Sequence, residues 1–339
     1  LRENFGRVHV NIGEPIALTP LLDATQPDWR AHIGQEGKAA TVSRAVDELA
    51  PRIMRHINSA AAMTPVNLLA LVLLATPRQV MLEADLLRQL DFCLRLLKLA
   101  PYSPRMTVTP LDPEQIVRTG EKLQMLERRE GGAIGLDARH AASVPYYRNN
   151  VLHLLAMPSL IACCFLSNEA VDEADLQRLA WRIYPYIASE LFLRWDEAGI
   201  PQVMVACLEA LRETGALVVD ANRCWRAAPP SSAEAMQLSL LAQPTLQTIE
   251  RYYLAIELLR RAGSGVVTQA ELEKRCQQMA GRMLTLYGFY SPEFHDRALF
   301  EGFLGLLRRR GVIRTDGEGR LVLDEVLDRV AEDAERVLS

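Results

Sequence analysis

The chain has 339 residues, a length that suits two or three domains of ordinary size. Hydrophobic residues make up 49% of the chain and charged residues 24%, as expected of a globular protein that buries a core. The net charge of −4 gives no overall attraction to nucleic acid or to an acidic membrane surface.

The first predicted element is a strand. The stretch "VHVNIGEPI" (residues 8–16) alternates β-branched and polar residues and breaks at Gly13 and Pro15, which is how a half-buried strand ends. A single strand leaves its backbone donors and acceptors unpaired, so its partners must lie elsewhere. Because the chain begins at Leu1 and not at Met, we expect the partner strands to precede it. A linker-like run with Pro27, Gly34 and Gly37 follows over residues 20–38.

The middle of the chain is predicted to be helical. From Thr41, apolar residues recur at three- and four-residue steps, which is the spacing of one helix face. Thr64 and Pro65 have the residue types of a helix N-cap and first position. Further helices are predicted over 66–75, over 83–99, and over 114–130 before a turn at Gly131-Gly132.

The most apolar segment runs from Tyr146 to Trp195 and is expected to form the core of a helical domain. It contains a long helix after "YYRNN" and a second helix through "RIYPYIASELFLRW". The apolar stretches 66–75 and 151–166 are shorter than the roughly 20 residues that a membrane-spanning helix needs. They are interpreted as buried helices, and a monotopic membrane contact stays open.

The last third holds a weak internal repeat. "LEALRETGALVVDANRCWRA" (residues 208–227) and "LGLLRRRGVIRTDGEGRLVL" (residues 304–323) share a helix ending at glycine, an aliphatic strand, a polar turn and a second strand. A helix that leads into a β-hairpin is typical of a winged-helix module. The fold class expected is therefore mainly α, a helical domain with two small winged-helix-like β-hairpins. Two more helices are predicted between the repeats, over 244–262 and 269–286.

Catalytic and metal-binding motifs are difficult to find in this sequence. No histidine has an aspartate five residues later, the spacing of an acyltransferase dyad; His9 is followed there by Glu14, but His9 lies within the predicted strand. There is no nucleophile-elbow motif, phosphate-binding glycine loop or paired metal-ligand motif, so no catalytic residue, metal or cofactor is predicted. The six cysteines are scattered, and the Cys163-Cys164 pair is interpreted as core packing.

One polar cluster introduces an apolar helix, the stretch "YYRNN". Arg148 could bind a phosphate, with Asn149 and Asn150 contributing amide contacts, so Arg148 and Asn149 are the candidate substrate-binding residues. The alternative is that these side chains satisfy backbone or interface groups at a helix end. The basic run at residues 308–310 is favoured as a solvated helix end stabilised by the helix dipole.

Several of these stretches resemble one enzyme family. "VNIGEPI" resembles the last strand of glycerophospholipid acyltransferase domains, which closes with a Gly-Glu-Pro turn. "INSAAAMTPVNLLALVLLAT" (57–76), "YYRNNVLHLLAMPSLIA" (146–162) and "YPYIASELFLRWD" (184–196) resemble stretches of the large bacterial membrane glycerol-3-phosphate 1-O-acyltransferase, in the same order and at similar separations. The resemblance covers essentially the whole chain.

The resemblance implies an activity for the intact protein. That family transfers an acyl group from acyl-carrier protein (acyl-ACP) or coenzyme A (acyl-CoA) to glycerol 3-phosphate, giving lysophosphatidic acid at the cytoplasmic face of the bacterial inner membrane. Its HxxxxD motif and phosphate-binding blocks do not occur in this sequence. The chain is therefore expected to be a C-terminal part, inactive alone, that supports an upstream catalytic domain and the membrane or acyl-donor surface, peripherally or monotopically attached, with no nucleic-acid partner.

Three regions are expected on this basis. Residues 1–37 would be the terminal strand and linker of the α/β acyltransferase domain, residues 38–200 a helical domain, and residues 201–339 a helical domain with two winged-helix-like units. The rival interpretation is a tandem winged-helix regulator that binds nucleic acid, which needs a basic helix before each wing. Arg212 stands against Glu209 and Glu213 in the first unit, the wrong balance for phosphates. A scaffold domain without ligand contacts is the third alternative.

Overall fold

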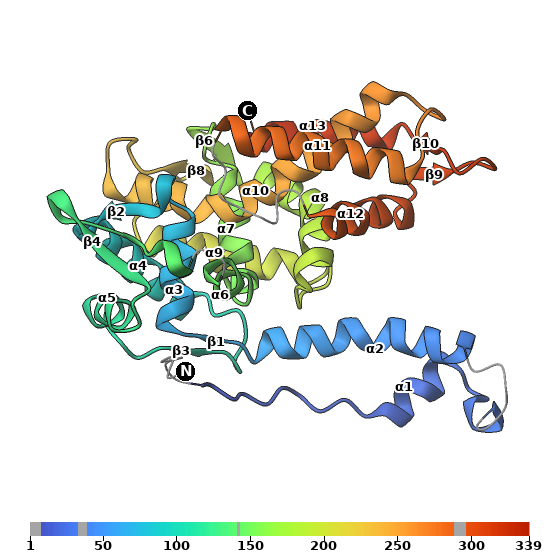
Figure 1. Cartoon of the computed structure of the whole chain (residues 1–339), viewed down its shortest axis with the longest axis horizontal. Coiled ribbons are helices and arrows are strands. Elements are labelled where there is room, and N and C mark those ends of the chain that lie inside the picture. The colour runs from blue at the N-terminus through green and yellow to red at the C-terminus, as the bar shows by residue number, and fades with distance from the viewer. Residues whose placement is uncertain (1–7, 33–38, 141–142, 288–295, 339) are drawn as a thin grey trace.

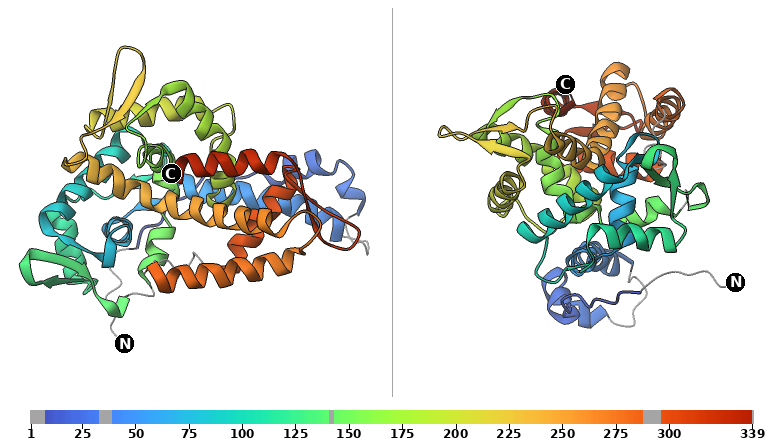
Figure 2. Two further views of the ribbon diagram at one scale, coloured as in Figure 1. Left: turned by 90° about the horizontal axis from the view of Figure 1, so that it is seen from above. Right: turned by 90° about the vertical axis from the view of Figure 1, so that its left-hand side faces the viewer.

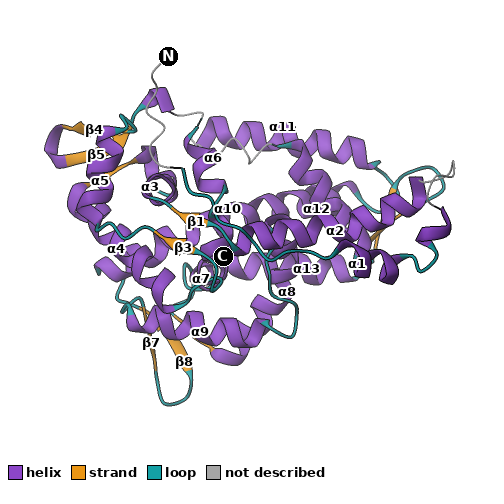
Figure 3. Cartoon of the chain, turned by 90° about the horizontal axis from the view of Figure 1, so that it is seen from below, coloured by secondary structure: helices purple, strands orange, loops and turns teal. Residues whose placement is uncertain are grey.

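The structure of the chain, a computed structural model, describes residues 8–32, 39–140, 143–287 and 296–338. Helices dominate it, and the short strands lie at its edges (Figures 1 and 3). The helices are α1 (Leu18–Thr25), α2 (Ala39–Ser59), α3 (Pro65–Leu74), α4 (Glu83–Leu99), α5 (Pro113–Lys122), α6 (Val144–Asn149), α7 (Ala156–Cys163), α8 (Glu173–Leu191), α9 (Ile200–Glu213), α10 (Ala233–Ala262), α11 (Gln269–Tyr287), α12 (Arg297–Arg309) and α13 (Val326–Leu338). The strands are β1 (Ala62–Met63), β2 (Val80–Leu82), β3 (Thr107–Val108), β4 (Leu126–Arg129), β5 (Ala133–Leu136), β6 (Ala170–Asp172), β7 (Leu217–Val219), β8 (Cys224–Ala227), β9 (Ile313–Thr315) and β10 (Leu321–Leu323).

The same strand–helix–helix–hairpin unit occurs three times along the chain. Unit 1 is β2-α4-α5-β4-β5 and unit 2 is β6-α8-α9-β7-β8, and in both sheets the last strand pairs antiparallel with the other two. Unit 3 is α11-α12-β9-β10, with residues 267–268 in the place of the first strand, where Thr268 bridges to Arg320. The two predicted winged-helix-like hairpins are therefore confirmed, and a third unit precedes them. The β7–β8 hairpin projects from the body (Figures 2 and 3).

Related sequences begin the first helix of all three units. They read "LEADLL" (82–87), "DEADLQ" (172–177) and "TQAELE" (268–273). The leucine at the fifth position of each, Leu86, Leu176 and Leu272, has no exposed side-chain surface. In units 2 and 3 the first residue of the stretch also caps the helix: Asp172 accepts from the amide of Ala174 at 2.8 Å, and the Thr268 hydroxyl accepts from the amide of Glu271 at 3.4 Å. In unit 1, Leu82 provides no side-chain cap. The repeat therefore specifies where each helix begins and which side it buries.

The second helix of each unit ends in the same left-handed turn. Gln124, Gly215 and Gly311 have φ angles of 56°, 83° and 73°. The amide of the next residue then donates to the carbonyl five residues back at 2.9–3.0 Å in each unit, which is a Schellman-type end. Glycine adopts this conformation without strain, whereas glutamine does so at a cost.

The left-handed turn predicts whether each of three substitutions raises or lowers the free energy of unfolding. Gly311→Ala should lower the free energy of unfolding by about 1 kcal/mol, because a Cβ there meets no neighbouring atom and the whole cost is backbone strain. Gln124→Gly should raise it by up to about 1 kcal/mol for the same reason. Gly302→Ala, inside α12 and equally unobstructed, should instead stabilise the chain by about 1 kcal/mol. Urea unfolding of the three variants measures all three signs, and destabilisation by Gly302→Ala would contradict this account.

The core lies between units 1 and 2. All eight residues of α7 are buried, and α7 packs against the 30-residue α10. A second hydrophobic cluster surrounds α12 in unit 3, so the buried residues form two clusters that meet near Tyr186 and Ile183. The N-terminal arm, made of residues 8–32 and α2, runs along one side of this body (Figure 1).

Three sequence predictions about local structure are wrong. The helix expected over 114–130 ends at Lys122, and residues 126–136 form the β4–β5 hairpin, because Gly131 and Gly132 both adopt positive φ and close a turn. The long helix expected after "YYRNN" is divided into a 3₁₀ helix over Leu152–Leu155 and α7, and "YYRN" itself ends the short helix α6. The run expected as a linker contains α1, which buries Leu21.

Other sequence predictions are confirmed by the structure or stay predictions. The predicted helices near 41–57, 66–75 and 83–99 are confirmed, and Thr64 forms a capping box with Asn67. Residues 8–17 have no regular secondary structure, so their strand pairing stays a prediction for an assembly that supplies a sheet. The domain boundary at residues 37 and 38 involves Gly37 and Lys38, which lie outside the described residues, and the one after Ile200 falls at the start of α9 and stays a prediction.

Candidate functional site

A wide groove of about 1930 Å³ separates the N-terminal arm from unit 1. It is lined by residues 9–16, the C-terminal end of α2, the start of α3, α5 and α6. Small-molecule pockets enclose roughly 300–1,000 Å³, so this groove exceeds what one small ligand fills. Its size suits a polypeptide surface better.

The extended segment before α1 is fixed to the body by polar contacts. The Nδ2 of Asn11 donates to the carbonyl of Ala60 at 2.7 Å and to the Thr107 hydroxyl at 3.1 Å. The Nδ1 of His56 lies 2.7 Å from the carbonyl of Glu14, which accepts. A Cβ on Gly13 would lie 3.0 Å from the carbonyl oxygen of His56, so the close approach there favours glycine. These contacts position the segment along the groove.

Apolar side chains on both walls of the groove are exposed. Of the groove-lining residues, Ile12 is 85% exposed, and Ile53, Ile57 and Tyr146 are 41%, 57% and 66% exposed. Val10, in the same extended segment but outside the groove lining, is 82% exposed. We call these five residues the docking face. Ile53 and Ile57 continue the apolar stripe of α2 that the sequence predicted, but the described part of the chain does not cover that stripe. Contiguous exposed apolar surface of this kind marks protein–protein or membrane contacts.

The charges around the groove are mostly basic. Arg118 and Lys122 project from α5 and form no ion pair with another described residue. Arg139 pairs with Asp137 at 2.7 Å, and this hydrogen-bonded pair lowers the pKa of Asp137 to about 2. The groove therefore offers two cationic side chains that no described carboxylate pairs with.

The candidate residues Arg148 and Asn149 lie beside this groove but do not line it. Arg148 is 6% exposed, and its Nε and Nη2 both donate to the Oδ1 of Asn149 at 3.1 Å. The structure thus brings the two together, with Arg148 in the interior and Asn149 at the surface. Their assignment as substrate-binding residues stays a prediction. From the same segment, Tyr146, Tyr147 and Asn150 line the groove instead.

A buried polar cluster fixes the end of α2 to the body. The Nδ2 of Asn58 donates to the carbonyl of Leu191 at 2.7 Å, and the carbonyl of Asn58 lies 3.0 Å from the Nε2 of His153. The ring of Tyr102 packs edge-on against His153, and its hydroxyl accepts from the amide of Arg194 at 2.9 Å. Burial lowers the pKa of His153 to about 4, so the ring is neutral at physiological pH and donates to the Asn58 carbonyl.

The vicinal cysteines lie in the core. The thiols of Cys163 and Cys164 are fully buried, and burial raises the pKa of Cys164 to about 12, which confirms the core-packing interpretation. Within the described ranges, no three His, Cys, Asp or Glu side chains are grouped so as to hold a metal ion. None of the helices described is both long and apolar enough to cross a bilayer.

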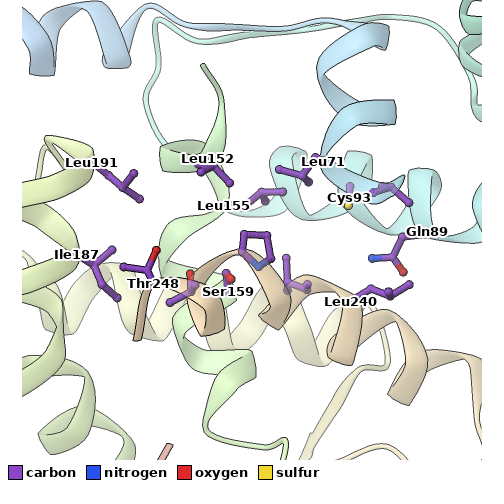
Figure 4. Close-up of a pocket in the computed structure, with 14 residues that line it drawn as sticks. Leu71, Gln89, Cys93, Leu152, Leu155, Ser159, Ile187, Leu191, Leu240 and Thr248 are labelled. Atoms are coloured by element: carbon purple, nitrogen blue, oxygen red, sulfur yellow. The ribbon is translucent and has the colours of Figure 1, made fainter. Parts of the chain in front are cut away.

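A small apolar pocket lies between α3, α4, α7, α8 and α10 (Figure 4). Leucine side chains from facing helices converge there, as Leu71, Leu155 and Leu240 do in the figure. Its volume is about 20 Å³, which is room for about one water molecule. It is therefore a packing gap in the core and not a ligand site.

Comparison with known proteins establishes the family. Residues 1–316 match the model of the glycerol-3-phosphate acyltransferase C-terminal region. The chain is 40% identical over 343 residues to a protein named glycerol-3-phosphate acyltransferase from Pseudomonas fluorescens (strain SBW25) and 41% identical to one from Pseudomonas aeruginosa (strain UCBPP-PA14). Another from Xanthomonas axonopodis pv. citri (strain 306) is 38% identical over 345 residues. The chain belongs to the glycerol-3-phosphate acyltransferase C-terminal region family.

The alignments also define what fraction of a family member this chain represents. They cover 100% of the chain but only 41%, 41% and 39% of the three relatives, so the chain spans about two fifths of their length. The family match ends between β9 and β10, and α13 follows it. The three long stretches that carried the resemblance, 57–76, 146–162 and 184–196, meet at the buried cluster of Asn58 and His153.

The sequence did not reveal the residues that define the groove. Asn11 and Asn58 look like ordinary polar residues, because their partners are 49 and 133 residues away. The one available signal was the strong amphipathic pattern of α2, which predicted a helix with one apolar face but not what that face contacts. Ile53 and Ile57 are exposed on the groove.

Proposed function

We propose that this chain is the C-terminal part of a glycerol-3-phosphate acyltransferase and that its groove holds the catalytic domain. The intact protein would transfer an acyl group from acyl-ACP or acyl-CoA to glycerol 3-phosphate, releasing lysophosphatidic acid. The observation that carries this proposal is the docking face, which the described part of the chain leaves exposed although its members are large and apolar.

The extended N-terminal segment supports the position of that contact. Val8, Val10 and Ile12 alternate along it, which is the period of a strand that presents one side to a core. Each is more than 80% exposed. In the proposed assembly the segment joins the catalytic sheet as an edge strand, and the apolar side chains pack against that domain.

We also propose that residues of this chain contact the substrate. Arg118 and Lys122 face the groove and suit the phosphate of glycerol 3-phosphate, because a dianion there meets two cations that form no ion pair with a described residue. Arg148 would act through Asn149, which it orients by two hydrogen bonds. We also propose that the whole protein works at the cytoplasmic face of the inner membrane as a peripheral or monotopic enzyme.

The docking face can be tested in the whole enzyme that contains this chain. Ile53→Asp together with Ile57→Asp should lower acyl transfer to glycerol 3-phosphate at least tenfold, because two carboxylates would be buried at the interface. The readout is radiolabelled lysophosphatidic acid formed from acyl-CoA. The same double variant should leave the unfolding temperature of this chain alone almost unchanged, since both side chains are exposed in it.

A matched control comes from the far side of the molecule. Val218, on the projecting β7–β8 hairpin, is 51% exposed, and Val218→Asp should leave activity unchanged. Full activity in the Ile53 and Ile57 double variant would refute docking at this face.

The nucleic-acid alternative gains a third winged-helix-like unit but no suitable charge pattern. Arg118 and Lys122 of α5 are offset on the same helix by Glu114 and Glu121. Of the three helices that precede a hairpin, α5, α9 and α12, only α12 has more basic than acidic residues. A protein that used the three units to bind phosphates would need a basic helix in each.

A further inference from the structure

A second cavity, of about 270 Å³, lies at the junction of units 2 and 3, far along the chain from the groove residues. Side chains of α8, α10, α12 and α13 line it. It sits where the two hydrophobic clusters meet, since Ile183 and Ile249 belong to one cluster and Tyr186 and Phe303 to the other. Junctions between packed units are frequent positions for ligand sites.

Three aromatic rings form the inner wall of this cavity. Tyr252 and Phe303 are stacked, with ring centroids 4.2 Å apart and planes inclined by 7°. Tyr186 is inclined to both, with centroids 5.8 Å from Phe303 and 6.4 Å from Tyr252. The hydroxyl of Tyr252 already donates to Glu190 at 2.7 Å. The wall therefore presents hydrocarbon surface and few hydrogen-bonding groups, which suits an alkyl chain better than a nucleobase.

The rim of the cavity carries a surplus of positive charge. Arg182, Arg310 and Arg329 line it with a single carboxylate, Asp333, which Arg182 neutralises at 2.8 Å. Arg310 lies 5.8 Å from the Tyr186 ring centroid and only 4.0 Å from the exposed carboxylate of Glu197. Arg329 forms no ion pair with any residue in the described ranges. At the mouth of this apolar cavity, Arg329 therefore has no ion-pair partner among the described residues, and Arg310 has one exposed partner at 4.0 Å.

We propose that this cavity binds a single-chain anionic amphiphile, with its alkyl chain against the aromatic wall and its carboxylate or phosphate head on Arg310 and Arg329. The volume lies near the lower end of the usual range of about 300–1,000 Å³ for small-molecule pockets, so it holds one chain and not the two chains of a membrane phospholipid. Guanidinium groups bind both carboxylate and phosphate in bidentate fashion. Bound there, the ligand contacts units 2 and 3 together and stabilises their packing.

Binding can be measured by calorimetry on the full chain at pH 8, with three probes used below their micelle concentrations. Sodium dodecanoate and monododecyl phosphate carry the two anionic heads, and dodecyltrimethylammonium carries the same chain with a positive head. Both anions should bind at least tenfold more tightly than the cation and should raise the unfolding temperature. Tighter binding of dodecanoate would indicate a free fatty acid as the source, and tighter binding of the phosphate a lysophospholipid.

Two independent variants locate the site. Val330→Trp fills the cavity from α13 and should abolish binding of both anions, with far-UV circular dichroism to confirm folding. Arg310→Gln with Arg329→Gln should weaken anion binding at least tenfold and leave the apolar wall unchanged. Arg336→Gln is the matched control, because Arg336 is exposed on α13, the helix of Arg329, but does not line the cavity.

Some results would overturn this proposal. Equal affinity for the cationic and anionic probes would exclude recognition by the arginines. Anion binding that survives both Val330→Trp and the double arginine variant would place the ligand elsewhere. If neither dodecanoate nor monododecyl phosphate bound, the site would be excluded.

Discussion

Truncation of Trp225 to alanine should lower the free energy of unfolding by about 3–5 kcal/mol, the range for large aromatic side chains in cores. Trp225 lies on β8, the central strand of unit 2, and has no exposed side-chain surface. Its Nε1 donates to the Oε2 of Glu173 at 2.9 Å, and Glu173 also pairs with Arg223. The loss combines a large cavity with a broken hydrogen bond, and urea unfolding measures it.

Two further variants separate these contributions. Trp225→Phe keeps most of the buried volume and should cost about 1–2 kcal/mol, because Glu173 retains Arg223 as a partner. Val218→Ala, on the neighbouring strand and 51% exposed, should change stability by less than about 0.5 kcal/mol. If Trp225→Ala cost no more than Val218→Ala, the hairpin of unit 2 would not be part of the cooperative core.

The position of Trp225 is equivalent in all three units, where Ile134 and Leu321 are also fully buried. Sequence reasoning found the hairpins of units 2 and 3 because Gly215 and Gly311 mark the helix end. It missed the hairpin of unit 1 because Gln124 occupies the same left-handed position, and glutamine gives no signal of positive φ. The helix start at Thr64-Pro65 was predictable, since a capping box depends only on residues three positions apart.

The candidate site was less predictable than the fold, for a physical reason. Helix faces and caps depend on neighbours in sequence, whereas the groove depends on contacts such as Asn58 with Leu191 across 133 residues. The amphipathic stripe of α2 was recognisable, but the pattern alone does not tell whether its partner lies within the same described chain. Arg148 was a reasonable candidate for phosphate by residue type, and its burial became known only from packing around α6.

Between pH 7 and pH 5, two buried groups should change the stability of the chain in opposite directions. His153 has a pKa of about 4 in the fold against an ordinary 6.5, so the unfolded chain binds its proton first and stability falls as pH decreases. Burial raises the pKa of Glu250 from an ordinary 4.5 to about 7, so the folded chain binds that proton first and stability rises as pH decreases. Each effect amounts to about 2 kcal/mol over this interval, and in the wild-type chain they nearly cancel.

Single variants should remove this cancellation. Between pH 7 and pH 5, His153→Gln should become more stable by about 2 kcal/mol, since only the Glu250 effect remains. Glu250→Gln should become less stable by a similar amount, and the double variant should again change little. The comparison is made within each variant, from urea unfolding at both pH values, because loss of the His153 hydrogen bond to Asn58 lowers stability at every pH. Identical pH dependence in both single variants would show that neither group titrates as its burial requires.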